Sequence, residues 1–200
     1  MPNGVQIDLY DPSYANNGGY VLFGGRLVNI KGLYFLIMAF SMIRKKLQKE
    51  YSLMIVGYGP EEKRLKKLSM ELGIRDKVHF IPWLAKSQFV KVIQNASVIV
   101  LPSLYEASPM FALESMACGK PVIASDIPAM RDLITHMYNG VLFKRGNVVQ
   151  LKNCLELLLE NPDLKLQLGR NARKTIEEKY SFEKVASEYI KIFQACAKKH

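Results

Sequence analysis

Two glutamates that lie eight positions apart, Glu106 and Glu114, are the residues of this sequence that most strongly suggest chemistry. The apolar run 98–101 before them predicts a buried strand. Pro109 between them suits the first position of a helix, because its fixed φ is already helical and its missing N–H has no partner there. Glu106 is therefore expected in a loop and Glu114 on a helix. Side chains on a helix tilt toward its N-terminus, so Glu114 should lean toward the end where free backbone N–H groups point.

Carboxylates next to a helix N-terminus fit the binding of a phosphorylated sugar nucleotide. The free N–H groups of Met110 and Phe111 would take a phosphate, and a carboxylate accepts hydrogen bonds from paired hydroxyls of a ribose or hexose. The simpler alternative is that both glutamates only sit near a helix start, where the helix dipole favours acidic residues. The glutamates alone leave both interpretations open.

A second group of residues favours the nucleotide interpretation. A strand is expected to end in Gly24 and Gly25, followed by Arg26, Lys31 and a helix from residue 33 to about 47. Glycines at a strand end let a ligand approach the backbone, and the two cations would face a diphosphate. The segment matches neither the dinucleotide fingerprint nor the phosphate loop of NTPases, and no Asp-x-Asp pair offers a metal clamp. The alternative is that both cations are solvated surface groups.

Further motifs follow in order along the chain. A predicted strand runs into a Gly-x-Gly-Pro turn at 57–60, a short segment Val-His-Phe follows at 78–80, and Cys-Gly-Lys-Pro-Val-Ile-Ala-Ser occupies 118–125. Together with the two groups above, these motifs resemble the C-terminal, donor-binding half of retaining glycosyltransferases of the GT-B fold, family 4 or "glycosyl transferases group 1". The resemblance runs from Pro2 to about Phe193, and it is specific because five spaced motifs agree.

The hydrophobic pattern indicates the same fold class. At 200 residues and 49% hydrophobic, the chain can bury one substantial core. Apolar runs alternate with amphipathic helical stretches, as in an α/β, doubly wound parallel sheet. The resemblance implies that this sheet is a Rossmann-like GT-B half-domain of about six strands with C-terminal helices. Ligands on such sheets bind at the carboxyl ends of the strands, where the glycine and glutamate loops fall. Strands are expected near 20–23, 52–57, 78–81, 97–101, 121–125 and 140–143.

The resemblance also implies how the chain is divided. Residues 1–18 resemble an interdomain linker, 19–180 a donor-binding domain, and 181–200 a C-terminal helix that in full-length relatives crosses toward the N-terminal domain. The chain therefore looks like half an enzyme, whose partner would be an N-terminal acceptor-binding domain or a separate subunit. Because catalysis needs both reactants in one cleft, the isolated chain is expected to bind the donor and to transfer little sugar.

The resemblance implies a role for each residue of the candidate site. A nucleoside diphosphate sugar would bind with no metal or other cofactor. Glu114 would hold the ribose hydroxyls, and Glu106 would approach the transferred hexosyl group, which moves with retention of its anomeric configuration. The residues implied to bind the diphosphate are Gly24, Gly25, Arg26, Lys31, Met110 and Phe111.

Some positions depart from the family pattern. Ala107 replaces a frequent glycine after the first glutamate, and Pro109, which has no N–H to donate, stands where a glycine is common. The base pocket is expected to involve the loop 81–83, in which packing and stacking are equal interpretations of Trp83.

Two other functional classes remain open. Sugar-nucleotide epimerases share the two-domain fold and a similar nucleotide cleft, so an epimerase half-domain is one alternative, although no acid/base residues for that chemistry stand out. A non-enzymatic nucleotide-binding module or regulatory subunit is the other.

The net charge of +10 indicates either anionic partners or solvated helix faces. The cations cluster on predicted polar helix faces, which favours the second interpretation; peripheral contact with an anionic membrane is the alternative. Nucleic acid is not expected as a partner, because no aromatic platform lies among the basic residues. The basic clusters are Arg44-Lys45-Lys46, 63–67 and Lys198-Lys199.

A polar start and apolar stretches shorter than about 20 residues predict a cytoplasmic chain.

Apolar stripes at helical spacing near the C-terminus predict core positions. If an N-terminal domain is missing, the second stripe would instead be exposed and drive self-association. The first stripe is Leu151, Leu155, Leu158 and Leu159, and the second is Val185, Tyr189, Ile192 and Phe193.

Three cysteines, Cys118, Cys154 and Cys196, are expected as reduced thiols in packed helices.

Overall fold

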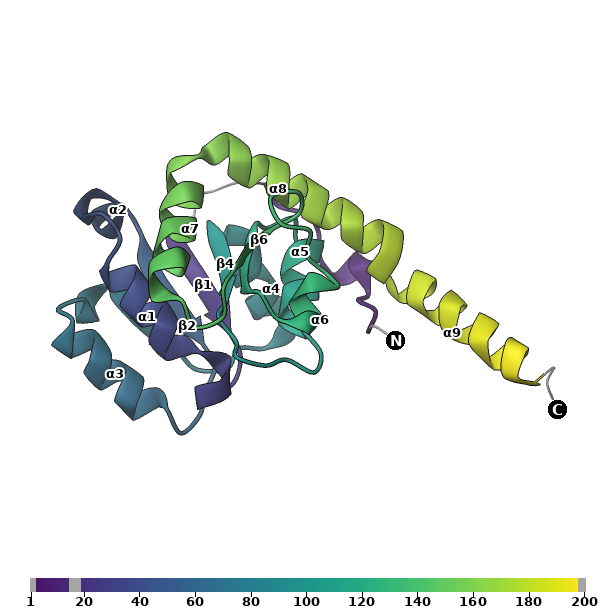
Figure 1. The fold of residues 1–200 in the computed structure, drawn as a ribbon, viewed down its shortest axis with the longest axis horizontal. Helices are drawn as coiled ribbons and strands as arrows, with labels where there is room; N and C mark the ends of the chain where they lie inside the picture. The colour runs from purple at the N-terminus through teal and green to yellow at the C-terminus, as the bar shows by residue number, and fades with distance from the viewer. Residues whose placement is uncertain (1–2, 15–18, 198–200) are drawn as a thin grey trace.

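The computed structural model describes residues 3–14 and 19–197, which form a six-stranded sheet with helices on both faces (Figure 1). The strand order is β3-β2-β1-β4-β5-β6, and every neighbouring pair is parallel. This topology confirms the predicted doubly wound, Rossmann-like α/β class. The strands are β1 (Tyr20–Gly24), β2 (Ser52–Val56), β3 (Val78–Ile81), β4 (Val98–Leu101), β5 (Val122–Ser125) and β6 (Val141–Phe143).

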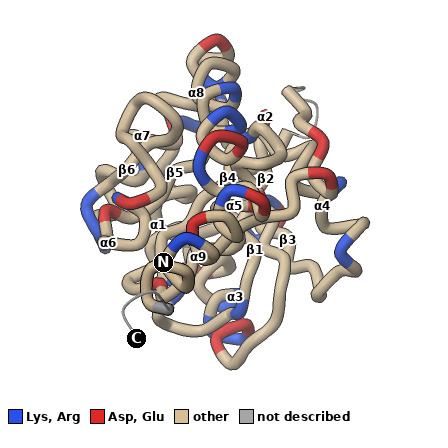
Figure 2. Tube along the Cα trace, turned by 90° about the vertical axis from the view of Figure 1, so that its right-hand side faces the viewer, with Lys and Arg blue, Asp and Glu red and all other residues tan. Residues whose placement is uncertain are grey.

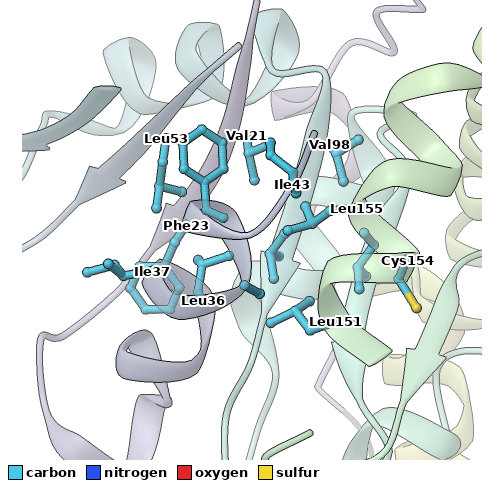
Figure 3. Packing of buried hydrophobic residues seen from close by; sticks show 14 of the residues in the cluster. Val21, Phe23, Leu36, Ile37, Ile43, Leu53, Val98, Leu151, Cys154 and Leu155 are labelled. Atoms are coloured by element: carbon cyan, nitrogen blue, oxygen red, sulfur yellow. The ribbon is translucent and has the colours of Figure 1, made fainter. Parts of the chain in front are cut away.

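Helices bury both faces of the central strands, which explains why these strands read as continuous apolar runs. Along β1 the side chains alternate between two cores, with Val21 and Phe23 in the first and Tyr20 and Leu22 in the second. Figure 3 shows the first core, where side chains of α1 and α7 pack against β1. The helices are α1 (Leu33–Ser41), α2 (Lys45–Glu50), α3 (Glu62–Glu71), α4 (Lys86–Asn95), α5 (Met110–Ala117), α6 (Pro128–Arg131), α7 (Val148–Glu160), α8 (Pro162–Thr175) and α9 (Phe182–Ala197), with short turns η1 (Ile7–Leu9), η2 (Asn29–Lys31), η3 (Arg75–Lys77) and η4 (Ile176–Tyr180).

The chain changes its direction of travel across the sheet between β1 and β4. From β1 it proceeds through β2 to β3, then returns to β4 on the other side of β1 and continues to β5 and β6. The segments that leave the carboxyl ends of β1 and β4 therefore diverge, and such a switch point leaves a crevice in which ligands bind. Both predicted ligand loops, after Gly24 and after Leu101, border this crevice.

The single helix expected from residue 33 to about 47 is two helices. α1 ends at Ser41, and α2 begins at Lys45 after Arg44 leaves helical geometry at ψ 139°. The Arg44 N–H donates instead to Glu156 Oε1 (2.9 Å) on α7, a carboxylate that is almost fully buried. A tertiary contact therefore ends the helix.

Helix α5 begins one residue later than expected. Pro109 is its N-cap, with φ −84° and ψ 57°, and Met110 is the first helical residue. These angles are close to those of an inverse γ-turn, and the Met110 N–H donates to Ser108 O (3.0 Å) across Pro109. The turn, rather than the helix, uses the fixed φ of the proline.

The N-terminal segment packs on the body of the molecule. The Val5 N–H donates to Tyr180 O and the Phe182 N–H donates to Val5 O, both at 2.9 Å. Tyr10, which follows η1, is 2% exposed. The segment is therefore tied to the end of η4 and to the start of α9, while the predicted boundaries at residues 18 and 180 stay predictions.

Helix α9 extends away from the sheet (Figure 1), and most of its apolar stripe is exposed. Val185 is buried, but Tyr189 and Ile192 are exposed and Phe193 is 68% exposed. The core interpretation of this stripe is wrong beyond Val185, because no described element covers the helix there. The first stripe, in α7, is buried throughout as predicted.

All three cysteines are free, but only two are packed. Cys118 and Cys154 are buried, and burial raises the pKa of the Cys118 thiol to about 12. Cys196 on α9 is exposed, which contradicts the expectation of packing.

Residues of both charge signs lie along the same helices, for example α3 and α8 (Figure 2). On α3 three of the four cations pair within the helix or with the residue just before it: Arg64 with Glu61, Lys66 with Glu62, and Lys67 with Glu71. The cluster Lys198-Lys199 lies outside the described residues. Of the helices formed by residues 3–14 and 19–197, none has the length and apolarity needed to cross a membrane.

Adjacent leucines of α7 test the importance of the first core. Leu158 is fully buried and Leu157 is 38% exposed, so the same substitution has different consequences at the two positions. Leu158→Ala should lower the free energy of unfolding by about 2–5 kcal/mol, because it leaves a cavity. Leu157→Ala should lower it by about 0.5 kcal/mol or less. Urea denaturation of both variants measures the difference, and equal losses would contradict the packing described.

Candidate functional site

One cavity of about 410 Å³ lies at the carboxyl ends of β1 and β4. Every residue that the sequence singled out for the candidate site lines it: Gly24, Gly25, Arg26, Lys31, Glu106, Met110, Phe111 and Glu114. The first four come from the end of β1 and the segment that leads into α1. The others come from the loop after β4 and from α5, so the switch point of the sheet joins the two groups.

Glu106 lies in the loop after β4, as expected, and its carboxylate is engaged at one oxygen. Lys31 Nζ lies 2.6 Å from Glu106 Oε1, and Ser103 Oγ donates to the same oxygen at 2.9 Å. The side chain of Glu106 is only 9% exposed, so this ion pair is shielded from solvent. Lys31 and Glu106 both line the cavity, so the lysine offsets the charge of the carboxylate where an anion would bind.

Glu114 lies on α5 and is engaged in a similar way. Tyr10 donates its hydroxyl to Glu114 Oε1 (2.8 Å), and Lys86 Nζ lies 2.5 Å from the same oxygen. Burial, and then the charge of Glu114, raise the pKa of Tyr10, so its hydroxyl stays protonated and acts as a donor. Lys86 is the first residue of α4 and lies 4.8 Å from the centre of the Tyr10 ring, a cation–π arrangement.

The start of α5 offers fewer free donors than the sequence suggested. The Met110 N–H is engaged with Ser108 O, so the expectation of a free donor there is wrong. Among the described residues, none accepts the Phe111 N–H, which remains available at the positive end of the helix. Arg26 is exposed and forms no ion pair with any described residue, so it too is available to an anion.

Glycines let the loops after β1 and β2 approach each other. Gly25 and Gly57 have φ of 150° and 145°, and a Cβ added at Gly57 would overlap Gly25 O. The Leu27 N–H donates to Tyr58 O (2.8 Å) across the same contact. Positions that require φ in this range strongly favour glycine, and these two hold Arg26 at the rim of the cavity.

Aromatic rings form an apolar wall of the cavity. Phe89 and Phe111 stack with ring centres 5.5 Å apart, Phe23 meets Phe111 edge-on at 6.5 Å, and Trp83 lies 5.7 Å from Phe89. Trp83 both packs on Phe89 and lines the cavity while remaining 56% exposed. The two interpretations of Trp83 therefore do not exclude each other.

Two residues that line the cavity, and a third that contacts Glu114 without lining the cavity, were not found from the sequence. Ser103 lies two residues after β4, Lys86 opens a helix at the carboxyl edge of the sheet, and Tyr10 lies in the linker-like segment. Ser103 lies just after a strand and Lys86 lies at the start of a helix, both at the carboxyl ends of the strands, where ligands bind. These positions could have identified both residues as site candidates. Tyr10 carried no such signal, since only the packing of the N-terminal segment brings it to Glu114.

The described residues contain no group of three or more His, Cys, Asp and Glu side chains placed to hold a metal ion. The cavity offers three cations, one free N–H at a helix start and two anchored carboxylates beside an aromatic wall; the cations are Arg26, Lys31 and Lys86. The arrangement suits a ligand that has an anionic part, hydroxyl groups and a flat apolar group.

Sequence relatives are glycosyltransferases. Residues 12–175 match the family model described as glycosyl transferases group 1. A protein of Haemophilus influenzae, named as an uncharacterized glycosyltransferase, is 35% identical over 170 residues, which are 84% of this chain and 47% of that protein. The chain spans about half the length of the curated relatives it matches.

Solved structures share the fold. Sucrose-phosphate synthase from Thermosynechococcus elongatus superposes on 100% of this chain and 53% of its own, with a TM-score of 0.89 and 25% identity. HepE from Anabaena, in complex with UDP and glucose, superposes on 96% of this chain and 55% of its own, with a TM-score of 0.86 and 22% identity, which shows the fold alone. With a family match over most of its length and the fold of one GT-B half, this chain belongs to the glycosyl transferases group 1 family.

Proposed function

We propose that this chain is the donor-binding part of a retaining glycosyltransferase, which binds a nucleoside diphosphate sugar without a metal and presents it for hexosyl transfer. The observation that carries the proposal is the cavity at the switch point, in which Arg26 and Lys31 meet the two glutamates. HepE is described in complex with UDP and glucose, which supports the same class of donor here.

The diphosphate is proposed to lie against Arg26, Lys31 and the N–H of Phe111. As the bond between sugar and diphosphate breaks, negative charge grows on the departing phosphate oxygens. Fixed cations and a helix N-terminus then interact more strongly with the transition state than with the bound donor, which lowers the barrier. These groups supply the stabilisation that a metal ion would otherwise provide.

Glu106 is proposed to face the sugar and Glu114 the ribose. Lys31 and Ser103 hold Glu106 through one oxygen, and a carboxylate held near the anomeric carbon stabilises the positive charge that develops there. Glu114 accepts hydrogen bonds from vicinal hydroxyls, which suits a ribose.

The acceptor is proposed to bind to a further part of the enzyme, a domain or a subunit. The chain covers 47% of its Haemophilus relative, and both substrates must meet in one cleft for transfer. An apolar groove of about 620 Å³ lies between α9 and the N-terminal segment, and Met110 lines both this groove and the donor cavity. A part that covers the groove would therefore lie next to the donor. The family match favours a transferase over the epimerase and the non-enzymatic module considered above.

Calorimetric titration tests donor binding. We expect UDP, GDP or ADP, or one of their sugar conjugates, to bind in the presence of EDTA. Arg26→Ala and Glu114→Ala should each weaken binding about tenfold or more, because each removes a hydrogen bond to or from a charged group. The Arg26 variant should leave the affinity for the free nucleoside unchanged, since a nucleoside has no phosphate.

Lys174→Ala is a suitable control for this titration. Lys174 is an exposed cation on α8 that pairs with Glu178 on η4, and it does not line the cavity. Its replacement should not change the affinity. Binding that requires a divalent metal, or that survives both cavity substitutions, would contradict the proposal.

The apolar face of α9 should make the isolated chain self-associate. Ile190 and Phe193 are 55% and 68% exposed, and burying them against a second copy removes apolar surface from water. Light scattering at high concentration should show a higher average mass than that of a monomer, and Ile190→Asp with Phe193→Asp should reduce it. Gln194→Asp adds a charge on the same helix without removing apolar surface and serves as control. A clean monomer for the unmodified chain would argue against an exposed docking face.

Peripheral contact with anionic lipid is the remaining alternative for the basic surface. Three cations of α3 already pair with neighbouring carboxylates, which supports solvated helix faces instead. Sedimentation with liposomes should therefore show equally weak binding to neutral and anionic vesicles. Clearly stronger binding to anionic vesicles, lost at high salt, would reinstate membrane contact.

A further inference from the structure

We propose that Tyr10 is a positioning residue that orients Glu114 toward the ribose and thereby sets the preference for ribose hydroxyls. The inference deepens the donor-binding function proposed above and rests on it. Tyr10 lies in the N-terminal segment rather than among the loops at the carboxyl edge of the sheet, and its hydroxyl lies 2.8 Å from Glu114 Oε1.

The backbone of Tyr10 is fixed to the end of the helix that carries Glu114. Arg173 Nη1 donates to Tyr10 O (2.6 Å) and to Ala117 O (2.8 Å). The Ser13 N–H donates to Cys118 O (3.0 Å), just after α5 ends. Because the segment and α5 share these contacts, the Tyr10 hydroxyl has a fixed position relative to Glu114.

Both donors to Glu114 meet the same oxygen. Tyr10 and Lys86 each donate to Oε1, and no described residue donates to Oε2. The side chain of Glu114 is 15% exposed and lines the cavity, so Oε2 is the oxygen left for a ligand. The Tyr10 ring also lies beneath Lys86 Nζ, so a single aromatic side chain places both donors. Burial, and then the charge of Glu114, raise the pKa of Tyr10, which keeps its hydroxyl a donor at neutral pH.

Packing alone does not account for the Tyr10 hydroxyl. A phenylalanine would fill the same buried site, but it would leave Glu114 Oε1 without one of its two donors. Tyr20 provides the contrast. Its hydroxyl donates to a backbone oxygen, Val92 O (2.7 Å), at the amino end of β1 and away from the cavity.

Matched Tyr10→Phe and Tyr20→Phe variants of the full chain test the inference. The probes are whichever of UDP, GDP and ADP binds the unmodified chain most tightly, and the 2′,3′-dideoxy form of the same nucleotide. The unmodified chain should prefer the ribose form by about tenfold or more, the effect of hydrogen bonds to a charged carboxylate. Tyr10→Phe should reduce this preference about three- to tenfold, with little change in the affinity for the dideoxy form. Tyr20→Phe should leave the ratio unchanged.

Equal weakening of both nucleotides by Tyr10→Phe, or an unchanged ratio, would overturn the inference, since a merely structural role moves both affinities together. A readout without nucleotide is the carboxyl ¹³C resonance of Glu114, assigned by its loss in Glu114→Gln. This resonance should shift in Tyr10→Phe and stay in place in Tyr20→Phe; a resonance that does not move overturns the inference. If it shifts but no nucleoside diphosphate binds at millimolar concentration, the proposed function fails, and the ribose role of Tyr10 fails with it.

Discussion

The central place of β1 in the sheet is the constraint on which the rest of the structure depends. β1 pairs with β2 on one side and β4 on the other, so its backbone is hydrogen-bonded along both edges. Its side chains belong to both cores, and a shift by one residue would exchange Val21 and Phe23 with Leu22 between them. Register is therefore strongly specified. A fixed register places Gly24 at the point where the two halves of the sheet diverge, and the cavity opens there.

Charge compensation in the cavity comes from residues that are distant in sequence. Glu106 pairs with Lys31, 75 positions away, and Glu114 with Lys86, 28 positions away. Two bare carboxylates would repel each other and any phosphate ligand, whereas each lysine cancels one charge and leaves the second oxygen of its partner open. In the proposed complex Lys31 contacts both Glu106 and the diphosphate.

The apolar surfaces differ between the sheet with its flanking helices and helix α9. The sheet and its flanking helices bury their apolar faces within the described residues, whereas α9 leaves Ile190 and Phe193 uncovered. The N-terminal segment meets the start of α9 and also supplies Tyr10 to Glu114. The surface proposed to receive the acceptor part is thus connected, through a few hydrogen bonds, to the carboxylate proposed to hold the ribose.

The sequence by itself determined the fold class, the order of the strands along the chain and the two groups of candidate residues, because strand periodicity, glycines at strand ends and helix-start chemistry act locally. Tertiary structure decided the rest. Contact with the buried Glu156 ends α1 early, packing of a remote segment brings Tyr10 to Glu114, and the extension of α9 into solvent exposes a stripe with core periodicity. Each of these depends on partners far away in sequence, which no local pattern records. The apolar spacing of a helix shows that it has a face to bury, but only the three-dimensional arrangement shows whether anything covers that face.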